Sequence, residues 1–373
     1  MKKILLFAAA VAAVACAKEA PQTSVENQVV VTTPAEENET SMPVAFGTNL
    51  TASVTVKSQG GVDAWDATQT LYVYGFQRQA VAIDYATVTP FIDKVSAVSP
   101  KTGVEGDLDL INPANKLPFY YQDNNTYDFF GYYIDDLTPA TVKETDGIYV
   151  PITITGGEDI MVAKANPAVD GASLSDYRYA YSAYAARRGV KPTLNFQHQL
   201  VQFTFNIESG SETAADHSLK VSKLELNALA KGDLYVAGNF LGFKNVTTEL
   251  TTLSLFGFNG YDVPNKVDGA AAQRIGDCIM VIPNTNAPVN GDTFKGTLYL
   301  TQKDAEEMPV DFTLDFKDVE GAPAELTSFA AGYSFDITLK VYNMQKIDVS
   351  AKLADWKSGG KISIDTDKLP EIL

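Results

Sequence analysis

The clearest chemical signature in the chain is a cysteine preceded by small residues, in Ala13-Val14-Ala15-Cys16. Small side chains at this place let a lipidating transferase reach a thiol that it can alkylate. We therefore predict that Cys16 carries lipid and becomes the first residue of the mature protein. The alternative is an ordinary signal peptide that is cleaved near Ala17 and followed by an incidental cysteine.

The residues before Cys16 have the parts of a secretory signal, and the whole segment resembles a bacterial lipobox. Lys2 and Lys3 supply positive charge, and the apolar run Ile4–Ala15 is too short to span a bilayer of about 30 Å. Residues 1–15 are therefore predicted to be a signal peptide. Two or three acyl chains on Cys16 would anchor the mature chain, because each buried methylene contributes about 0.8 kcal/mol.

The histidines and the second cysteine do not form the pattern of a catalytic or metal site. His198 alternates with Phe196 and Leu200, which favours a core histidine with a satisfied ring nitrogen over a ligand or a base. His217 is interpreted as a loop residue. Cys278 lies in an apolar run and is predicted to be a small core residue rather than a reactive thiol. With Cys16 acylated, no disulfide within the chain is possible.

The remaining polar residues also lack the spacing of a known site. We find no local serine–histidine or cysteine–histidine signature, no metal-ligand spacing and no phosphate-binding loop, so we predict no enzyme activity, metal or cofactor. Asp365-Thr366-Asp367 lacks the spacing and the central glycine of a calcium loop. Aromatic residues in Phe119–Tyr121 or Tyr177–Tyr184 are suited either to stacking on sugars or to ordinary packing.

The charge of the chain excludes some partners. It has 46 acidic and 29 basic residues, a net charge of −17, and loss of Lys2 and Lys3 makes the mature chain more negative still. Nucleic acid requires a basic surface, and anionic lipid would repel this one. An acidic balance of this kind suits a soluble surface outside the cytoplasm.

The pattern of apolar residues predicts an all-β protein after a polar tether. Residues 17–42 are rich in Pro, Glu, Ser, Thr and Asn and cannot bury enough apolar surface to fold alone. The short apolar run Val29–Val31 interrupts this segment and could pair as a strand at the edge of a sheet. Helical periodicity is confined to two short candidates, Thr301–Glu307 and Tyr179–Arg188. Strand-like runs occur at Val44–Val56, Thr70–Phe76, Tyr127–Tyr133, Tyr149–Thr155, Thr193–Ile207, Lys220–Leu226, Cys278–Ile282, Phe294–Thr301, Val310–Phe316, Ser334–Tyr342, Lys346–Lys352 and Lys361–Ile364.

The length of the chain favours two domains, because a single core seldom serves so many residues. Short strands separated by turn residues indicate β-sandwiches. The segment Lys164–Pro192 contains several turn signals and is interpreted as the connection. We predict a lipidated tether over 16–43, an N-terminal β-sandwich over 44–188 and a C-terminal β-sandwich over 189–373.

Several blocks of the sequence together resemble the fimbrillin families of the Bacteroidetes. The strand Thr193–Phe205 contains Phe196, His198 and Leu200 in an F-x-H-x-L pattern that is similar to one in those families. Each block is weak alone, but their joint order is specific, and the resemblance covers about residues 44–364. The other blocks are Ala64-Trp65 with Leu71–Phe76, Tyr127–Tyr133, Asp159–Ala163, Phe329–Ile337, and Ile347–Ala351 with Trp356.

The resemblance implies both a fold and a role. Fimbrillin-like proteins have two β-sandwich domains of the transthyretin-like, Greek-key type, are exported as lipidated precursors to the outer-membrane surface, and are built into adhesive fimbriae. In members that polymerise, a protease removes the lipidated segment together with the first strand. The open groove then accepts a strand from another subunit, with main-chain hydrogen bonds and side-chain pockets that favour binding.

This sequence departs from the family pattern at the cleavage site. The polymerising members are cut after an arginine, but no arginine precedes Arg78 here. Lys57 is the only basic residue between Lys18 and Arg78, so it is either a substitute site for proteolytic maturation or a solvated loop lysine. The segment Lys361–Asp365 is a second candidate donor strand, or else an edge strand of its own domain.

The sequence therefore predicts a structural or accessory subunit of a cell-surface adhesive fimbria, assembled by β-strand exchange. Its expected partners are other fimbrial subunits, the outer membrane through the lipid on Cys16, and ligands on host or bacterial surfaces, with no nucleic acid. The alternative is a monomeric surface lipoprotein that binds glycan without polymerising. A hydrolase is a third interpretation, and the lack of a polar constellation argues against it.

Overall fold

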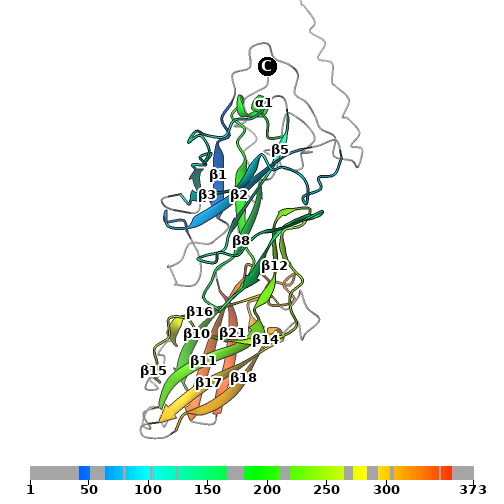
Figure 1. Ribbon diagram of the computed structural model, residues 1–373. Coiled ribbons are helices and arrows are strands. Elements are labelled where there is room, and N and C mark those ends of the chain that lie inside the picture. Colours follow the sequence, from blue (N-terminus) through cyan, green and yellow to red (C-terminus); the bar gives the residue numbers. More distant parts are fainter. Residues whose placement is uncertain are drawn as a thin grey trace, which may run out of the picture.

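Strands make up more than half of the described part of the chain, and turns and loops make up most of the rest. The computed structural model describes residues 42–50, 64–78, 81–100, 103, 105–122, 125–165, 180–210, 219–263, 272–283, 293–302, 306–343 and 346–354. The predicted features at Cys16, Lys57, His217, Trp356 and 361–365 lie outside these residues. Figure 1 shows an elongated molecule, with β1, β2, β3, β5 and β8 at one end, β10, β11, β16, β17, β18 and β21 at the other, and β12 between them.

The N-terminal end is built on a seven-stranded sheet with the strand order β3-β2-β5-β8-β9-β1-β4. All neighbours in it are antiparallel except β1 and β9, which run parallel. Leu71, Phe129 and Phe196 lie on the face that encloses one buried core together with Trp65. The strands are β1 (Phe46–Leu50), β2 (Thr70–Gln77), β3 (Ile92–Val98), β4 (Glu105–Leu108), β5 (Tyr127–Tyr133), β8 (Met161–Ala165) and β9 (Thr193–His198).

A four-stranded sheet joins the two ends of the molecule. Its order is β13-β12-β7-β6, with β6 (Val142–Glu144), β7 (Gly147–Thr153), β12 (Lys231–Gly238) and β13 (Gly242–Lys244). Tyr74 and Phe130, on the second face of the seven-stranded sheet, belong to the same buried cluster as Val150 and Leu234 of this sheet. The same cluster continues into the C-terminal sheets, so one core extends through most of the molecule.

The C-terminal end has two further sheets with the orders β16-β10-β20-β21-β19 and β14-β11-β17-β18. Phe203, Phe294 and Phe335 pack between them, with ring centroids of Phe203 and Phe294 5.1 Å apart. The molecule is therefore an all-β protein of β-sandwich type. The strands are β10 (Val201–Ser209), β11 (Leu219–Leu229), β14 (Leu250–Ser254), β15 (Tyr261–Asp262), β16 (Gln273–Val281), β17 (Thr293–Gln302), β18 (Met308–Asp315), β19 (Val319–Glu320), β20 (Ser334–Asn343) and β21 (Lys346–Ala354).

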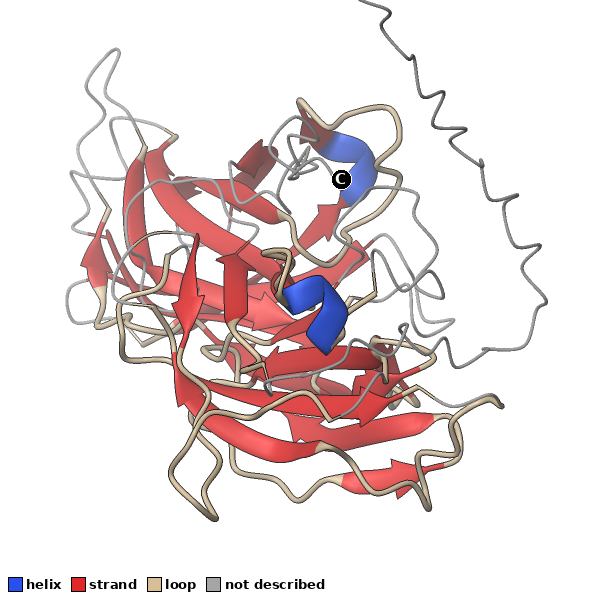
Figure 2. Cartoon of the chain, turned by 90° about the horizontal axis from the view of Figure 1, so that it is seen from above, coloured by secondary structure: helices blue, strands red, loops and turns tan. Residues whose placement is uncertain are grey.

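Helix is restricted to two short segments in the described residues, as Figure 2 shows in blue. The candidate Tyr179–Arg188 contains α1 (Ala183–Ala186), whose first turn is capped by Ser182. The second segment is a 3-10 turn at Phe316–Asp318. The other helical candidate, at 301–307, begins instead as the end of β17. Local propensity did not determine the structure at this place, because pairing with β11 extends β17 as a strand to Gln302.

The strand run predicted at Thr193–Ile207 is two strands, β9 and β10. Gln199 and Leu200 separate them, and β9 pairs with β8 and β1 whereas β10 pairs with β16 and β20. The predicted domain boundary at 188/189 precedes β9, and β9 belongs to the seven-stranded sheet. We therefore propose that the first sandwich gives way to the second at Gln199–Leu200.

Candidate functional site in the first strand

The first described strand, β1, lies inside the seven-stranded sheet rather than at its edge. Residues 47–50 pair in parallel with residues 193–196 of β9, and residues 46–49 pair in antiparallel with 108–105 of β4. The described residues end at Leu50 and resume at Ala64, so Lys57 lies in sequence between β1 and the other strands of the sheet. A cut after Lys57 would therefore separate β1 from all the strands with which it pairs.

Backbone hydrogen bonds fix the chain before and within β1. The Val44 amide donates to the Phe119 carbonyl at 2.7 Å, and the Tyr121 amide donates to the Met42 carbonyl at 3.0 Å. The Gly47 amide donates to the Pro192 carbonyl at 2.9 Å. The chain is thus bound to residues 119–121 from Met42 to Val44, and it is paired on both sides only within β1.

Side chains on the inner face of β1 complete the N-terminal core. Phe46 is 1% exposed, and its ring meets that of Phe129 edge-on at a centroid distance of 5.0 Å. Thr48 is also buried, and its hydroxyl donates to the Gly106 carbonyl at 3.2 Å. Burying a phenylalanine side chain contributes about 1.5–3 kcal/mol, so loss of β1 would leave an apolar gap in this core.

The first arginine of the chain is not available to a protease in the folded protein. Arg78 follows β2 and is 7% exposed. Its Nε donates to one carboxylate oxygen of Asp128 at 3.1 Å and a terminal nitrogen donates to the other at 2.9 Å. This two-point pair is buried on both sides, and drawing Arg78 out would leave the charge of Asp128 unpaired in the core.

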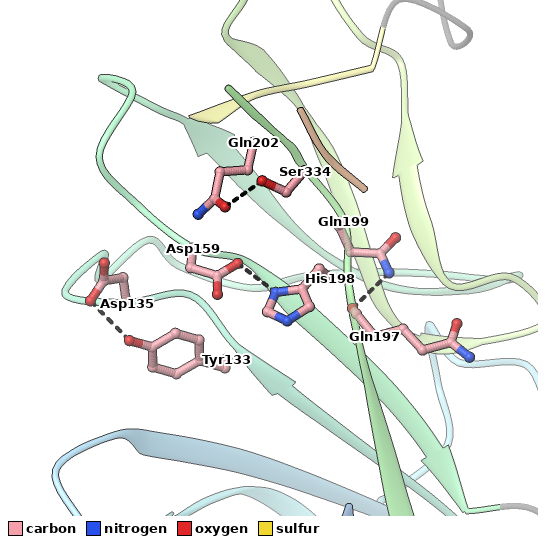
Figure 3. Close-up of polar contacts among 8 residues, drawn as sticks. All are labelled: Tyr133, Asp135, Asp159, Gln197, His198, Gln199, Gln202 and Ser334. Atoms are coloured by element: carbon pink, nitrogen blue, oxygen red, sulfur yellow. Dashed lines mark hydrogen bonds and ion pairs between the residues drawn. The ribbon is translucent and has the colours of Figure 1, made fainter. Parts of the chain in front are cut away.

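The histidine of the F-x-H-x-L block is buried where the N-terminal sheet leads into the C-terminal strands (Figure 3). Nδ1 of His198 lies 3.0 Å from Oδ1 of Asp159, which comes just before β8. The prediction of a core histidine with a satisfied nitrogen is confirmed. Sequence reasoning did not identify Asp159 as its partner, although both residues stood in the blocks that resemble fimbrillins.

Other polar contacts surround this pair. The Tyr133 hydroxyl donates to Asp135 at 3.0 Å, and burial raises the pKa of that carboxyl. The Ser334 hydroxyl donates to Gln202 at 2.8 Å and links β20 to β10. The first contact holds the turn after β5 and the second joins two strands, and together with the His198–Asp159 pair they suit a structural junction.

The one cysteine that the structure describes has the properties of a core residue. Cys278 is fully buried in β16, and burial raises the pKa of its thiol to about 12, with a further contribution from the charge of Asp159. A thiol with so high a pKa is neutral at physiological pH and is a poor nucleophile. Its assignment as a small core residue is confirmed by its burial.

Among the described aromatic residues that suited either sugar stacking or packing, Phe119, Tyr121 and Tyr181 are buried at less than 10% exposure. Tyr120 is the one of these described residues that is clearly open to solvent, at 38%. Within the residues that the structure describes, no group of three or more His, Cys, Asp or Glu side chains is placed to hold a metal ion. In the same residues, no helix is both long and apolar enough to cross a membrane.

The solved structures that match this chain include proteins from Bacteroides species. A candidate cell adhesion protein from Bacteroides uniformis has a TM-score of 0.50 and 16% identity, and the match covers 86% of this chain and 100% of that one. A second candidate cell adhesion protein, from Bacteroides ovatus, has a TM-score of 0.47 and 13% identity over 85% and 99% of the two chains. A fimbrial protein from Bacteroides vulgatus has a TM-score of 0.48 and 12% identity over 84% and 99%.

At such identities, the likeness to the Bacteroides uniformis protein concerns the fold alone. No curated protein matches the sequence. The sequence pattern of a family described as fimbrillin-like matches residues 55–356, which is most of the chain. The match contains the seven-stranded sheet except β1, and all of the C-terminal strands. This protein therefore belongs to the fimbrillin-like family.

Proposed function

We propose that this protein is a structural or accessory subunit of a cell-surface adhesive fimbria, exported as a lipoprotein through Cys16 and assembled by β-strand exchange. Membership in the fimbrillin-like family supports the fimbrial role. The observation that carries the assembly step is the position of β1, between β9 and β4 and in front of Lys57. A strand so placed is removable by one cut, and its removal opens the middle of a sheet.

Removal of β1 creates a site with a defined chemistry. The facing edges of β9 and β4 would lose their partners, leaving main-chain donors and acceptors in two rows. The space left by Phe46, against Phe129, would take a large apolar side chain. An extended segment of another subunit fits both requirements, because it supplies main-chain hydrogen bonds and alternate side chains at once.

Lys57 is the site at which we expect the cut. Arg78, the first arginine, is held in a buried ion pair with Asp128, so a trypsin-like protease cannot reach the arginine side chain in the folded protein. Between Lys18 and Arg78, Lys57 is the only basic residue in the sequence. Cleavage there would release β1 together with the lipidated Cys16, so the anchor and the first strand leave as one piece.

The incoming strand is proposed to come from a second copy of the chain or from another fimbrial subunit. The segment Lys361–Asp365 stays a candidate donor, since its residues alternate between apolar and polar types and follow Gly359-Gly360. Lipid on Cys16 would hold the precursor at the outer membrane until the cut. Adhesion to host or bacterial surfaces would then be a property of the fibre.

Limited proteolysis under native conditions tests the proposal. The chain from Ala17 onward, purified without lipid, is incubated with a trypsin-like protease and analysed by mass spectrometry and by SDS electrophoresis without heating. We expect a cut after Lys57, followed by ladders that resist SDS. The matched control is Lys57→Gln, which should stay uncut and monomeric. If the unsubstituted chain also remains intact and monomeric, the proposal fails and the monomeric glycan-binding alternative gains support.

A further inference from the structure

The outer side of β1 is narrow at Gly47. A Cβ atom placed on this residue would lie 3.1 Å from the Thr193 hydroxyl oxygen on β9 and 3.4 Å from Cε of Lys191. Real Cβ atoms seldom approach other atoms as closely as 3.1 Å. A larger side chain would extend further in the same direction and meet both neighbours.

An exposed ion pair joins Lys191 to the strand on the other side of β1. The Lys191 ammonium group contacts the carboxylate of Asp107 on β4. Asp107 is the register partner of Gly47 on one side, and Thr193 is its partner on the other. The ion pair therefore passes over β1 at the position of its glycine and links the segments that flank the strand. A side chain larger than that of alanine or serine would press on Lys191 and disturb this pair.

Space, and not backbone conformation, is what requires a small residue here. Gly47 lies within a regular strand and is absent from the glycines with positive φ in the described residues. A residue with a side chain could adopt its conformation without strain. Ala45, two residues earlier on the same side, is exposed, so the restriction does not extend along the whole strand.

We propose that Thr193 and the Lys191–Asp107 ion pair act as a size filter on strand exchange. The filter admits to the place of β1 a strand with glycine, or at most a residue as small as alanine or serine, at the position that faces Thr193. The accepted partner is an extended segment in which a large apolar residue, in the place of Phe46, is followed directly by such a small residue. This inference rests on the proposed function, since it determines which strands can take part.

Substitutions in the intact chain test the filter without any exchange. Gly47→Val should lower the urea midpoint of unfolding clearly, and Gly47→Ala should lower it less. Combining Gly47→Val with Thr193→Ala and Lys191→Ala should recover most of the loss, because the added atoms then have room. Ala45→Val is the control and should change little. A Gly47→Val chain as stable as the original, or one that the second-site changes do not rescue, overturns the filter.

Peptide binding tests the role in exchange. The probe is a fluorescein-labelled peptide with the sequence of residues 43–50, added to chain that has been cut after Lys57 and separated from its first strand. The peptide with valine at position 47 should bind about tenfold more weakly than the original, a ratio that corresponds to about 1.4 kcal/mol of overpacking. Thr193→Ala with Lys191→Ala in the target should remove most of that difference.

The outcomes separate the two proposals. Equal binding of the glycine and valine peptides overturns the filter, while strand exchange stands. If the cut chain binds neither peptide, strand exchange is overturned. The filter then has no part in assembly, even if the substitutions in the intact chain show the steric effect. A peptide with valine in place of Ala45 should bind within about twofold of the original, which shows that the loss is specific to position 47.

Discussion

Two phenylalanine-bearing strands, β1 at one end of the molecule and β20 at the other, each lie between a parallel and an antiparallel neighbour, and these two strands differ in how firmly they are held. At the N-terminal end, β1 has 5 residues, of which 47–50 are in register with β9. At the C-terminal end, β20 has 10 residues, and residues 334–341 are in register with 202–209 of β10. Both strands bury phenylalanine side chains, but β20 is bound over twice the length.

If the proposed strand exchange holds, one fold contains a replaceable strand and a permanent one. A parallel strand needs a long connection to its neighbour, so both insertions depend on contacts distant in sequence. In the proposed assembly, the short strand β1 fills part of the N-terminal core and would leave after one cut. A long insertion between two strands of the C-terminal sheet cannot leave without unfolding that sheet.

The largest expected effect comes from Phe335→Ala in β20. Phe335 is fully buried and its ring packs edge-on against Phe329 at 4.8 Å. Truncation of a buried phenylalanine costs about 3–5 kcal/mol, and the full cost should appear in the free energy of unfolding measured with urea. Phe46→Ala in β1 should cost less, because its loss cannot exceed the free energy with which β1 docks.

Equal effects of the two substitutions would contradict the claim that β1 is held less firmly than β20. Phe46→Ala should also speed hydrogen exchange of the β4 and β9 amides that pair with β1, while amides of β10 and β21 stay protected. Faster exchange across the whole molecule in Phe46→Ala would show that β1 is as integral to the fold as β20.

A second prediction concerns the part of the N-terminal sheet that remains after β1 leaves. Arg78→Ala removes one partner of a buried ion pair and leaves Asp128 uncompensated, which should cost about 3 kcal/mol. Because the pair joins the end of β2 to β5, the cost should be similar before and after the cut at Lys57. Lys143→Ala is the control, since its ion pair with Asp93 is exposed and should contribute less than about 1 kcal/mol.

The sequence predicted the strands with strong patterns and missed the ones that depend on partners. Runs such as Tyr127–Tyr133 and Ser334–Tyr342 are confirmed as β5 and β20 because their own residues favour a buried strand. β4 carries two acidic residues and a glycine, so no local pattern marks it, yet it is the second neighbour of β1. Pairing, and not propensity, makes it a strand.

The candidate site could be predicted only in part for the same reason. The F-x-H-x-L block correctly placed His198 in the core, but its partner Asp159 is 39 residues away and required the fold. The ion pair of Lys191 with Asp107 spans 84 residues, and only the register of β1 brings it over Gly47. Contacts of this kind follow from strand order, which alternating patterns do not specify.

A third, smaller effect is expected where the two ends meet. Asp159→Ala removes the hydrogen-bond partner of the buried His198 ring and should cost about 1–3 kcal/mol. Asp159→Asn keeps an oxygen that accepts a hydrogen bond and should recover part of the loss. Urea unfolding measures both variants. Equal stability of the alanine variant and the original chain would show that this pair contributes nothing to the junction.

The last prediction concerns stability at alkaline pH, where we expect a difference between the two ends that is absent at neutral pH. Tyrosines dominate the buried polar groups around the seven-stranded sheet, and burial raises the pKa of Tyr74 to about 12 and those of Tyr85, Tyr121, Tyr132 and Tyr181 as well. The C-terminal core relies on phenylalanine instead. Alkaline conditions should therefore weaken the N-terminal end first.

The sign follows from the two pKa values of each group. In the unfolded chain tyrosine loses its proton near pH 10, whereas folded Tyr74 keeps it to about 12, so its contribution is complete below pH 10 and declines as the pH rises from 10 toward 12. Cys278 acts in the same sense in the C-terminal core, from 9 to about 12, but it is a single group against several tyrosines.

Fluorescence can assign this alkaline loss to one end of the molecule. Trp65 is buried in the N-terminal core, so in a Trp356→Phe chain its emission reports on that end, while circular dichroism follows all the strands. Between about pH 8 and about pH 11, the urea midpoint of the Trp65 signal should fall further than that of the circular dichroism signal. Coincident midpoints at both values would mean that the core cluster shared by the N-terminal and C-terminal sheets couples the two ends too tightly for one to weaken alone.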